Sequence, residues 1–210
     1  TFWVGTKGNG ILKIYDYEFD KNISDCRAEV LTTSNSALSS NAVYCFAKSH
    51  RNLLWIGDEE GLTYYSYREK RIKSIPIRIG NEDFKYIHDI YETADSELWL
   101  VSVGMGVVKA RIAGTPDNPV IVDAQRYIIN DGELGSNYFF TIYAENEANL
   151  LFGNKGYGVF RYNETTNGLE PVSTHKYENM TLNNILAISK DSSNNYLFGT
   201  SYGLIKYTSE

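Results

Sequence analysis

The sequence predicts an all-β protein, a β-propeller of four-stranded antiparallel blades, and three observations support this. A short apolar run, a glycine-containing turn and a second apolar and aromatic run recur five times. The copies follow one another at intervals of 44 to 52 residues, measured between Gly5, Gly57, Val101, Gly153 and Gly199. Aromatic residues make up 14% of the chain, which favours strands over helices.

Each recurring motif has the pattern of a β-hairpin. The five copies begin near Phe2, Leu54, Leu98, Leu150 and Tyr196. A regular period of this length indicates a repeat architecture in which each repeat is one supersecondary unit. A β-sandwich would not repeat its sequence at a fixed period, and a β-solenoid would repeat over fewer residues.

An apolar segment before each of the last four hairpins predicts a further strand. Twelve residues before the column of Trp55 and Trp99, every copy is apolar: Val43, Ile87, Phe139 and Ile185. Nine residues before it, the same holds for Phe46, Ile90, Ile142 and Ile188. Because these segments are almost continuously apolar, we expect a strand buried on both faces and placed innermost in its blade.

A more variable segment follows each of the first four hairpins and predicts an outer edge strand. These segments cover residues 27–31, 71–77, 120–127 and 169–172, with a loop at 114–119 before the third. Their charges and prolines suit the edge of a sheet.

Four-stranded sheets repeated in this way pack radially into a propeller. We expect one propeller region over residues 1–210, with a partial blade at 1–37, whole blades at 38–82, 83–133 and 134–180, and a partial blade at 181–210. Since the chain begins and ends within a blade, we expect a fragment of a larger ring rather than a ring of five.

Composition and motifs argue against several functions. The formal net charge of −6 disfavours a nucleic-acid partner, and no apolar run is long enough to span or contact a membrane. Cys45 lies in an apolar strand pattern, so a buried free thiol is favoured over a bridge to Cys26. With no Cys/His cluster, hydrolase nucleophile motif or phosphate-binding loop, we predict no metal, cofactor or catalytic residue.

The repeat resembles that of the two-component regulator propeller. The resemblance rests on residues 52–62 (Asn-Leu-Leu-Trp-Ile-Gly-Asp-Glu-Glu-Gly-Leu), on residues 2–6 with Tyr15 and Asp16, and on residues 197–204 with Tyr207. In the third copy Val101 and Ser102 replace the glycine and threonine of the pattern, so its turn geometry is in question. The resemblance implies a periplasmic sensor region of a Bacteroidetes hybrid two-component system, feeding a histidine kinase and in many members responding to glycans.

In a propeller, the turn before each inner strand and the hairpin after the second strand lie on one face. Amides, aromatic rings and charges there suit a polar ligand. The candidate ligand-binding residues are Asn41, Asp58, Glu59, His88, Asn137, Tyr138, Tyr157, Asn184 and Tyr202. The simpler interpretation is that asparagine and glycine form turns without any ligand.

For three other groups of residues, we favour a structural role over ligand binding or catalysis. Trp3, Trp55 and Trp99 are expected in the core between blades, and residues 58–60 at a solvated hairpin tip. Of the three histidines, His50, His88 and His175, only His88 falls on an inner strand, where it would line the central channel.

The function we expect is a non-catalytic extracytoplasmic sensor that binds a small molecule or oligosaccharide. Its other partners would be further blades of the same protein and a second copy in a homodimer. Two alternatives remain open: a propeller glycosidase or polysaccharide lyase, with converging carboxylates, and a protein-interaction scaffold without a deep pocket.

Overall fold

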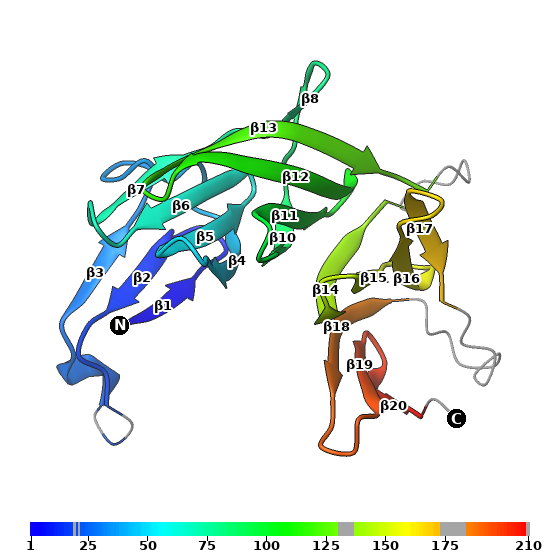
Figure 1. The fold of residues 1–210 in the computed structure, drawn as a ribbon. Helices are drawn as coiled ribbons and strands as arrows, with labels where there is room; N and C mark the ends of the chain where they lie inside the picture. Colours follow the sequence, from blue (N-terminus) through cyan, green and yellow to red (C-terminus); the bar gives the residue numbers. More distant parts are fainter. Residues whose placement is uncertain (19, 21, 130–136, 173–183, 209–210) are drawn as a thin grey trace.

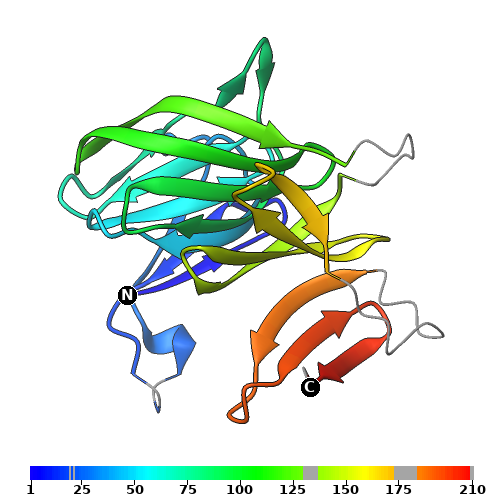
Figure 2. The same ribbon diagram turned by 45° about the vertical axis from the view of Figure 1, so that its right-hand side comes forward.

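The described part of the chain folds into five antiparallel β-sheets of three or four strands, which follow one another in an open arc, and one separate two-stranded hairpin (Figure 1). The computed structural model describes residues 1–18, 20, 22–129, 137–172 and 184–208. Apart from one 3-10 turn (η1, Ile23–Asp25), every regular element in these residues is a strand. The all-β prediction with four-stranded antiparallel blades is confirmed. Figure 2 shows the same succession of sheets from a second direction.

The strands are short and follow the chain in order within each sheet. The first sheet holds β1 (Phe2–Gly5), β2 (Ile11–Ile14) and β3 (Ala28–Leu31). The second holds β4 (Val43–Lys48), β5 (Leu53–Asp58), β6 (Leu62–Ser66) and β7 (Arg71–Ser74). The third holds β10 (Ile87–Glu92), β11 (Glu97–Ser102), β12 (Gly106–Thr115) and β13 (Asn118–Tyr127). The fourth holds β14 (Phe139–Asn146), β15 (Asn149–Asn154), β16 (Gly158–Asn163) and β17 (Gly168–Pro171), and the fifth holds β18 (Ile185–Lys190), β19 (Tyr196–Thr200) and β20 (Gly203–Tyr207).

The first strands of the last four sheets contact one another along the inner side of the arc, in the order β4, β10, β14, β18 (Figure 1). Their innermost position is therefore as predicted. Burial on both faces is wrong for them, because several of their side chains are partly exposed, as in β4 and β18. The second strands of the three four-stranded sheets are the most buried: β5 is buried along its whole length, and β11 and β15 at every residue but the first, since these strands have neighbours on both edges.

Apolar clusters fill the space between successive sheets. Trp55 is fully buried between the second and third sheets, together with Leu53, Leu100 and Val108. Trp99 lies between the third and fourth sheets, where its ring is stacked on Tyr127 with centroids 5.8 Å apart. Trp55 and Trp99 therefore belong to the core, as the sequence suggested, whereas Trp3 is partly buried and packs against the cluster between the first and second sheets.

The glycine of the repeat serves close packing rather than the hairpin turn. A Cβ at Gly57 would lie 2.5 Å from Cys45 Sγ and 2.7 Å from the carbonyl oxygen of Ile87, in the next sheet. In the third sheet Val101 occupies this column and is buried. The hairpin after it is intact, because Gly104 and Gly106 supply the positive φ angles of +106° and +87°.

Two features of the third repeat differ from the prediction. Residues 114–119 do not form a loop: β12 and β13 run on through them as a long hairpin closed by Pro116 and Asp117. An additional small hairpin, β8 (Arg78–Ile79) and β9 (Glu82–Asp83), stands out from the arc (Figure 1).

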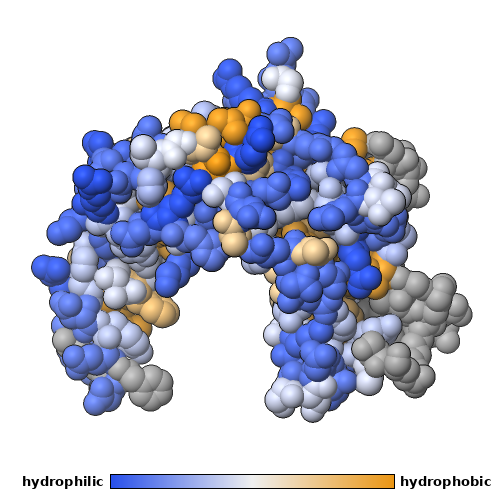
Figure 3. All heavy atoms as spheres, in the orientation of Figure 1, coloured by the Kyte–Doolittle hydropathy of each residue, from blue (hydrophilic) through white to orange (hydrophobic). Residues whose placement is uncertain are grey.

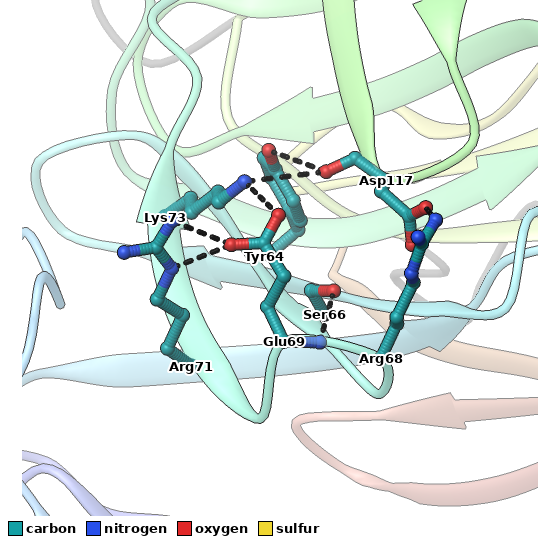
Figure 4. A network of polar contacts seen from close by, with 7 residues as sticks. All are labelled: Tyr64, Ser66, Arg68, Glu69, Arg71, Lys73 and Asp117. Atoms are coloured by element: carbon teal, nitrogen blue, oxygen red, sulfur yellow. Dashed lines mark hydrogen bonds and ion pairs between the residues drawn. The ribbon is translucent and has the colours of Figure 1, made fainter.

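The long hairpin reaches the second sheet, which explains why it is extended (Figure 4). Asp117 forms an ion pair with Arg68 and accepts a hydrogen bond from Lys73 Nζ through its carbonyl oxygen, at 3.4 Å. Tyr64 Oη donates to the same carbonyl oxygen at 3.5 Å. These contacts add a polar connection between two blades outside their apolar core.

Both cysteines are free, so the alternative of a bridge is wrong. The Cys45 thiol donates to the carbonyl oxygen of Ile87 at 3.7 Å, and burial raises its pKa well above the usual value.

The surface is mostly hydrophilic, with hydrophobic atoms gathered near the top of the arc in Figure 3. Val120 and Val122, on β13, are among the exposed apolar side chains.

Candidate ligand-binding face

Main-chain hydrogen bonds tie the predicted turns into a belt along one end of the sheets. Each bond joins the hairpin after a second strand to the start of an inner strand, either of the same sheet or of the next one. The belt consists of Val43 N to Thr6 O (2.8 Å), Glu59 N to Ala42 O (3.1 Å), Tyr86 N to Glu59 O (3.0 Å), Val103 N to Tyr86 O (3.2 Å) and Lys155 N to Tyr138 O (2.8 Å). Lys155 and Asn184 continue it as a bridge into the fifth sheet. The turns therefore lie on a common face.

Asn41 and Asn137 have the same local role in two different repeats. Asn41 Oδ1 accepts a hydrogen bond from Thr33 N at 2.9 Å, and Asn137 Oδ1 accepts one from Ile129 N at 2.7 Å. Both bonds fasten the segment that leads into an inner strand to the backbone eight residues earlier. Each side chain therefore already has a hydrogen-bond partner in the backbone. This agrees with the simpler interpretation that these asparagines form turns without any ligand.

The acidic hairpin at residues 58–60 is not a uniformly solvated tip. Asp58 is fully buried and accepts hydrogen bonds from Ser39 Oγ at 2.6 Å and from the backbone N–H groups of Glu60 and Gly61. Burial raises the pKa of its carboxyl group, which the hydrogen bonds oppose. Glu59 is partly exposed and accepts from Ser40 Oγ at 3.2 Å. Of these two carboxylates, only Glu59 presents a surface to a ligand.

The remaining candidates on the turns are spread along the face. Tyr138 is partly buried, with Lys155 Nζ 5.4 Å from its ring centroid. Asn184 is partly buried on the segment before β18. Tyr157 and Tyr202 stand exposed on the hairpins of the fourth and fifth sheets, Tyr202 at 79% of its full area. These side chains belong to the fourth and fifth sheets, whereas Asn41 and Glu59 belong to the second.

His88 lies apart from the turns, in a row of rings on the inner strands. It stacks on Tyr44 of β4, with ring centroids 4.3 Å apart and planes at 15°, and meets the edge of Phe140 of β14 at 5.5 Å. All three side chains are partly exposed. The row joins three successive blades across the inner side of the arc.

A shared backbone irregularity places this row. Each of the inner strands β4, β10, β14 and β18 shifts register at the same step, between Val43 and Cys45 in β4 and at the equivalent step in the other three. The residue that falls between is Tyr44, His88, Phe140 or Leu186. A β-bulge of this kind re-aims a side chain, and bulges are frequent next to functional sites. The sequence analysis missed Tyr44 and Phe140, although the column eleven residues before Trp55 and Trp99 would have found them.

The row is uncharged and borders a carboxylate. Burial lowers the pKa of His88, so the imidazole is neutral at pH 7. Burial and the negative charge of Glu59 raise the pKa of the Tyr44 phenol. A neutral aromatic surface beside a partly exposed carboxylate can stack against the apolar face of a ligand and accept hydrogen bonds from its hydroxyl groups.

Among the described residues, no three His, Cys, Asp or Glu side chains gather as a metal site would require. No helix in that part of the chain has the length and apolar character to cross a membrane. His175 lies outside the described residues.

No protein-family model matches the sequence, and no curated protein matches it. Solved structures with the same fold include the extracellular domain of the putative hybrid two-component system BT4673 from B. thetaiotaomicron, at 16% identity and a TM-score of 0.75 over 99% of this chain. A second structure of that extracellular domain, described as a putative one-component system, gives 17% identity and a TM-score of 0.71. The chain spans 28% and 26% of the length of these two structures.

Propeller enzymes share the fold as well. A streptogramin B lyase gives 16% identity and a TM-score of 0.62, over 98% of this chain and 64% of the lyase. The comparisons confirm the propeller and the expected resemblance, in fold, to extracellular two-component sensor domains. At these identities they establish the fold alone.

Proposed function

We propose that this chain is part of an extracytoplasmic sensor propeller, and that its ligand, an oligosaccharide, binds on the inner side of the arc against Tyr44, His88 and Phe140. The observation that carries the proposal is the aromatic row itself, which is built by the same bulge in successive blades. A core does not need these partly exposed rings, whereas a sugar-binding surface uses them to stack against pyranose rings.

Signalling in this proposal follows from the location of the row. Its rings belong to separate sheets, so a ligand that contacts all three favours one relative arrangement of the blades. The downstream partner would be a histidine kinase, and the blades beyond this chain would complete the ring. The resemblance to extracellular two-component domains supports both expectations and the extracytoplasmic location.

A thermal-unfolding screen of the full-length protein against a panel of neutral oligosaccharides tests the proposal. A ligand that binds only the folded state raises the midpoint in a dose-dependent way, by a free energy of about 2.7 kcal/mol at one hundred times its Kd. We expect one saccharide to raise the midpoint and to be recovered intact by chromatography. Cleavage of that saccharide would identify an enzyme instead, and a panel with no active member would contradict a glycan sensor.

A further inference from the structure

A second concave site lies at the outer edge of the arc, between the first and second sheets. A cavity of about 610 Å³ opens there between β3 and β7, and a neighbouring one of about 320 Å³ lies beside β2. The two cavities share Glu29, Tyr65 and Lys70 in their walls, so they form one peripheral groove. The larger part alone falls within the range of small-ligand sites.

The peripheral groove is basic although the chain is acidic. Its walls include five cationic side chains: Lys13, Arg27, Lys70, Arg71 and Lys73. The carboxylates that oppose them are Glu29, in the wall, and Glu69, which holds Arg71 and Lys73 at 2.5 Å each (Figure 4). In a chain of formal net charge −6, this concentration of positive charge focuses a local field that attracts anions.

Two of the five cations have no carboxylate partner among the described residues. Lys70 makes no ion pair and no side-chain hydrogen bond there, and Arg27 lies over the ring of Tyr15 at 4.4 Å. Both are exposed: Lys70 lines both cavities, and Arg27 lines the smaller one. They are the groups free to pair with an anion that enters the groove.

A buried lysine with several polar and aromatic contacts lines the groove. Lys13 is 6% exposed and donates a hydrogen bond to Tyr65 Oη at 2.7 Å. Its Nζ lies 5.0, 4.7 and 4.4 Å from the ring centroids of Trp3, Tyr15 and Tyr65. Glu29 is 3.9 Å away, so the ammonium group is held in place with only a distant carboxylate.

The backbone at Lys70 adds an independent argument. Lys70 has a φ of +54°, a conformation that glycine and asparagine adopt readily and lysine rarely. The equivalent turn of the fourth sheet, just before β17, has Asn167 at a φ of +47°. A lysine strains the backbone at this position, where asparagine or glycine would not. This strain indicates that the positive charge of Lys70 has a function.

We propose that the peripheral groove binds an acidic oligosaccharide, one that carries carboxylate or sulfate groups, with the anionic group at Lys70 and Arg27 and the sugar against the exposed ring of Tyr67. The size of the two joined cavities favours a ligand larger than an inorganic anion. The peripheral groove is distinct from the aromatic row. The inference rests on the proposed function only in that it takes a saccharide as the ligand.

Calorimetric titration of the full-length protein with trigalacturonic acid tests the inference, with neutral galactotriose as the matched probe. In the double variant Arg27→Gln/Lys70→Asn the charges are removed, and asparagine suits the positive φ of position 70. The control is Lys48→Gln/Arg111→Gln, which removes two exposed charges that make no ion pair among the described residues.

We expect trigalacturonic acid to bind the wild-type protein and the control alike, and the groove variant at least about tenfold more weakly, with weaker binding at high salt. Galactotriose should not bind in the groove. Equal affinity in the two double variants, or no binding of trigalacturonic acid, would overturn the inference, as would equal competition by acetate at the same concentration. Because Tyr44→Ala/His88→Ala should leave this binding unchanged, failure here is distinguishable from failure of the proposed function.

Discussion

Single residues in the second strands decide how closely two blades approach. Gly57 is packed against both Cys45 and the carbonyl oxygen of Ile87, and a backbone carbonyl cannot move aside as a flexible side chain can. The same column in the fourth sheet, Gly153, would place a Cβ 2.8 Å from the carbonyl oxygen of Ile185. The repeat glycine is therefore a spacer between sheets.

Replacing this spacer should be costly. We expect Gly57→Ala to lower the free energy of unfolding by about 1 to 3 kcal/mol, because the new methyl group overpacks the contact between the second and third sheets. Gly168→Ala is the control, since the nearest atoms to its Cβ lie 3.8 Å away. Urea unfolding of both variants gives the comparison, and a Gly57→Ala protein as stable as Gly168→Ala would contradict the close-packing role.

His88 should make stability depend on pH. Its pKa is lowered by burial, so the folded state binds fewer protons than the unfolded state between the lowered pKa and about 6.5. Stability present at neutral pH is therefore lost as the pH falls through this window, by at most about 1.4 kcal/mol per pH unit. His88→Phe keeps an aromatic ring in the row and should lack this component when unfolding is measured at pH 7.5 and 5.5. An unchanged pH dependence in His88→Phe would show that His88 does not contribute to it.

Residue types alone predicted part of the candidate site. The repeat columns identified the tryptophan core and placed His88 on an inner strand. Asn41, Asn137 and Asp58 were predicted to bind a ligand because of their polar side chains and their place on turns. In the structure, each side chain accepts a hydrogen bond from a nearby segment of the chain. Such bonds depend on the backbone path, which spacing in the sequence does not reveal.

At the scale of elements, Asp89 connects two inner strands. Its carboxylate, on β10, accepts hydrogen bonds from Ile142 N at 2.8 Å and Thr141 Oγ1 at 3.2 Å, both on β14. Burial raises its pKa, which these bonds oppose. These bonds hold the inner strands of the third and fourth sheets together, next to the aromatic row.

Removing this connection should weaken the contact between β10 and β14. Asp89→Ala leaves the partly buried Ile142 N–H without its acceptor, at a cost of about 1 kcal/mol, the low end of the range for an unsatisfied donor. We expect faster hydrogen exchange at the Ile142 amide, measured by NMR. Asp123→Ala, on the exposed face of β13, is the control and should leave that amide protected. Unchanged exchange in Asp89→Ala would mean that Asp89 does not hold β14.

Strand order was predictable from the repeat, whereas strand length was not. The turn at Pro116 and Asp117 indicated a loop, yet contacts of Asp117 with the second sheet extend both strands through it. The β8–β9 hairpin was missed although Gly80 and Asn81 form a two-residue turn signal. Contacts between distant elements determine the length of β12 and β13, and the β8–β9 hairpin lies outside the repeated motif.

At the scale of the whole molecule, the arc presents two surfaces of different chemistry. The inner side carries the neutral row of Tyr44, His88 and Phe140, and the outer edge carries the basic groove. The repeat period predicted the arrangement of blades. It could not predict either surface, because both are formed by side chains that the repeat does not fix.

The most direct test of the sensor proposal is a calorimetric titration of the full-length protein with the neutral saccharide that the stability screen selects. The account predicts that binding is lost in Tyr44→Ala/His88→Ala, while circular dichroism shows the β-sheet content retained, and that Arg27→Gln/Lys70→Asn binds as the wild type does. Wild-type affinity in the Tyr44→Ala/His88→Ala protein would contradict the placement of the ligand on the inner side of the arc.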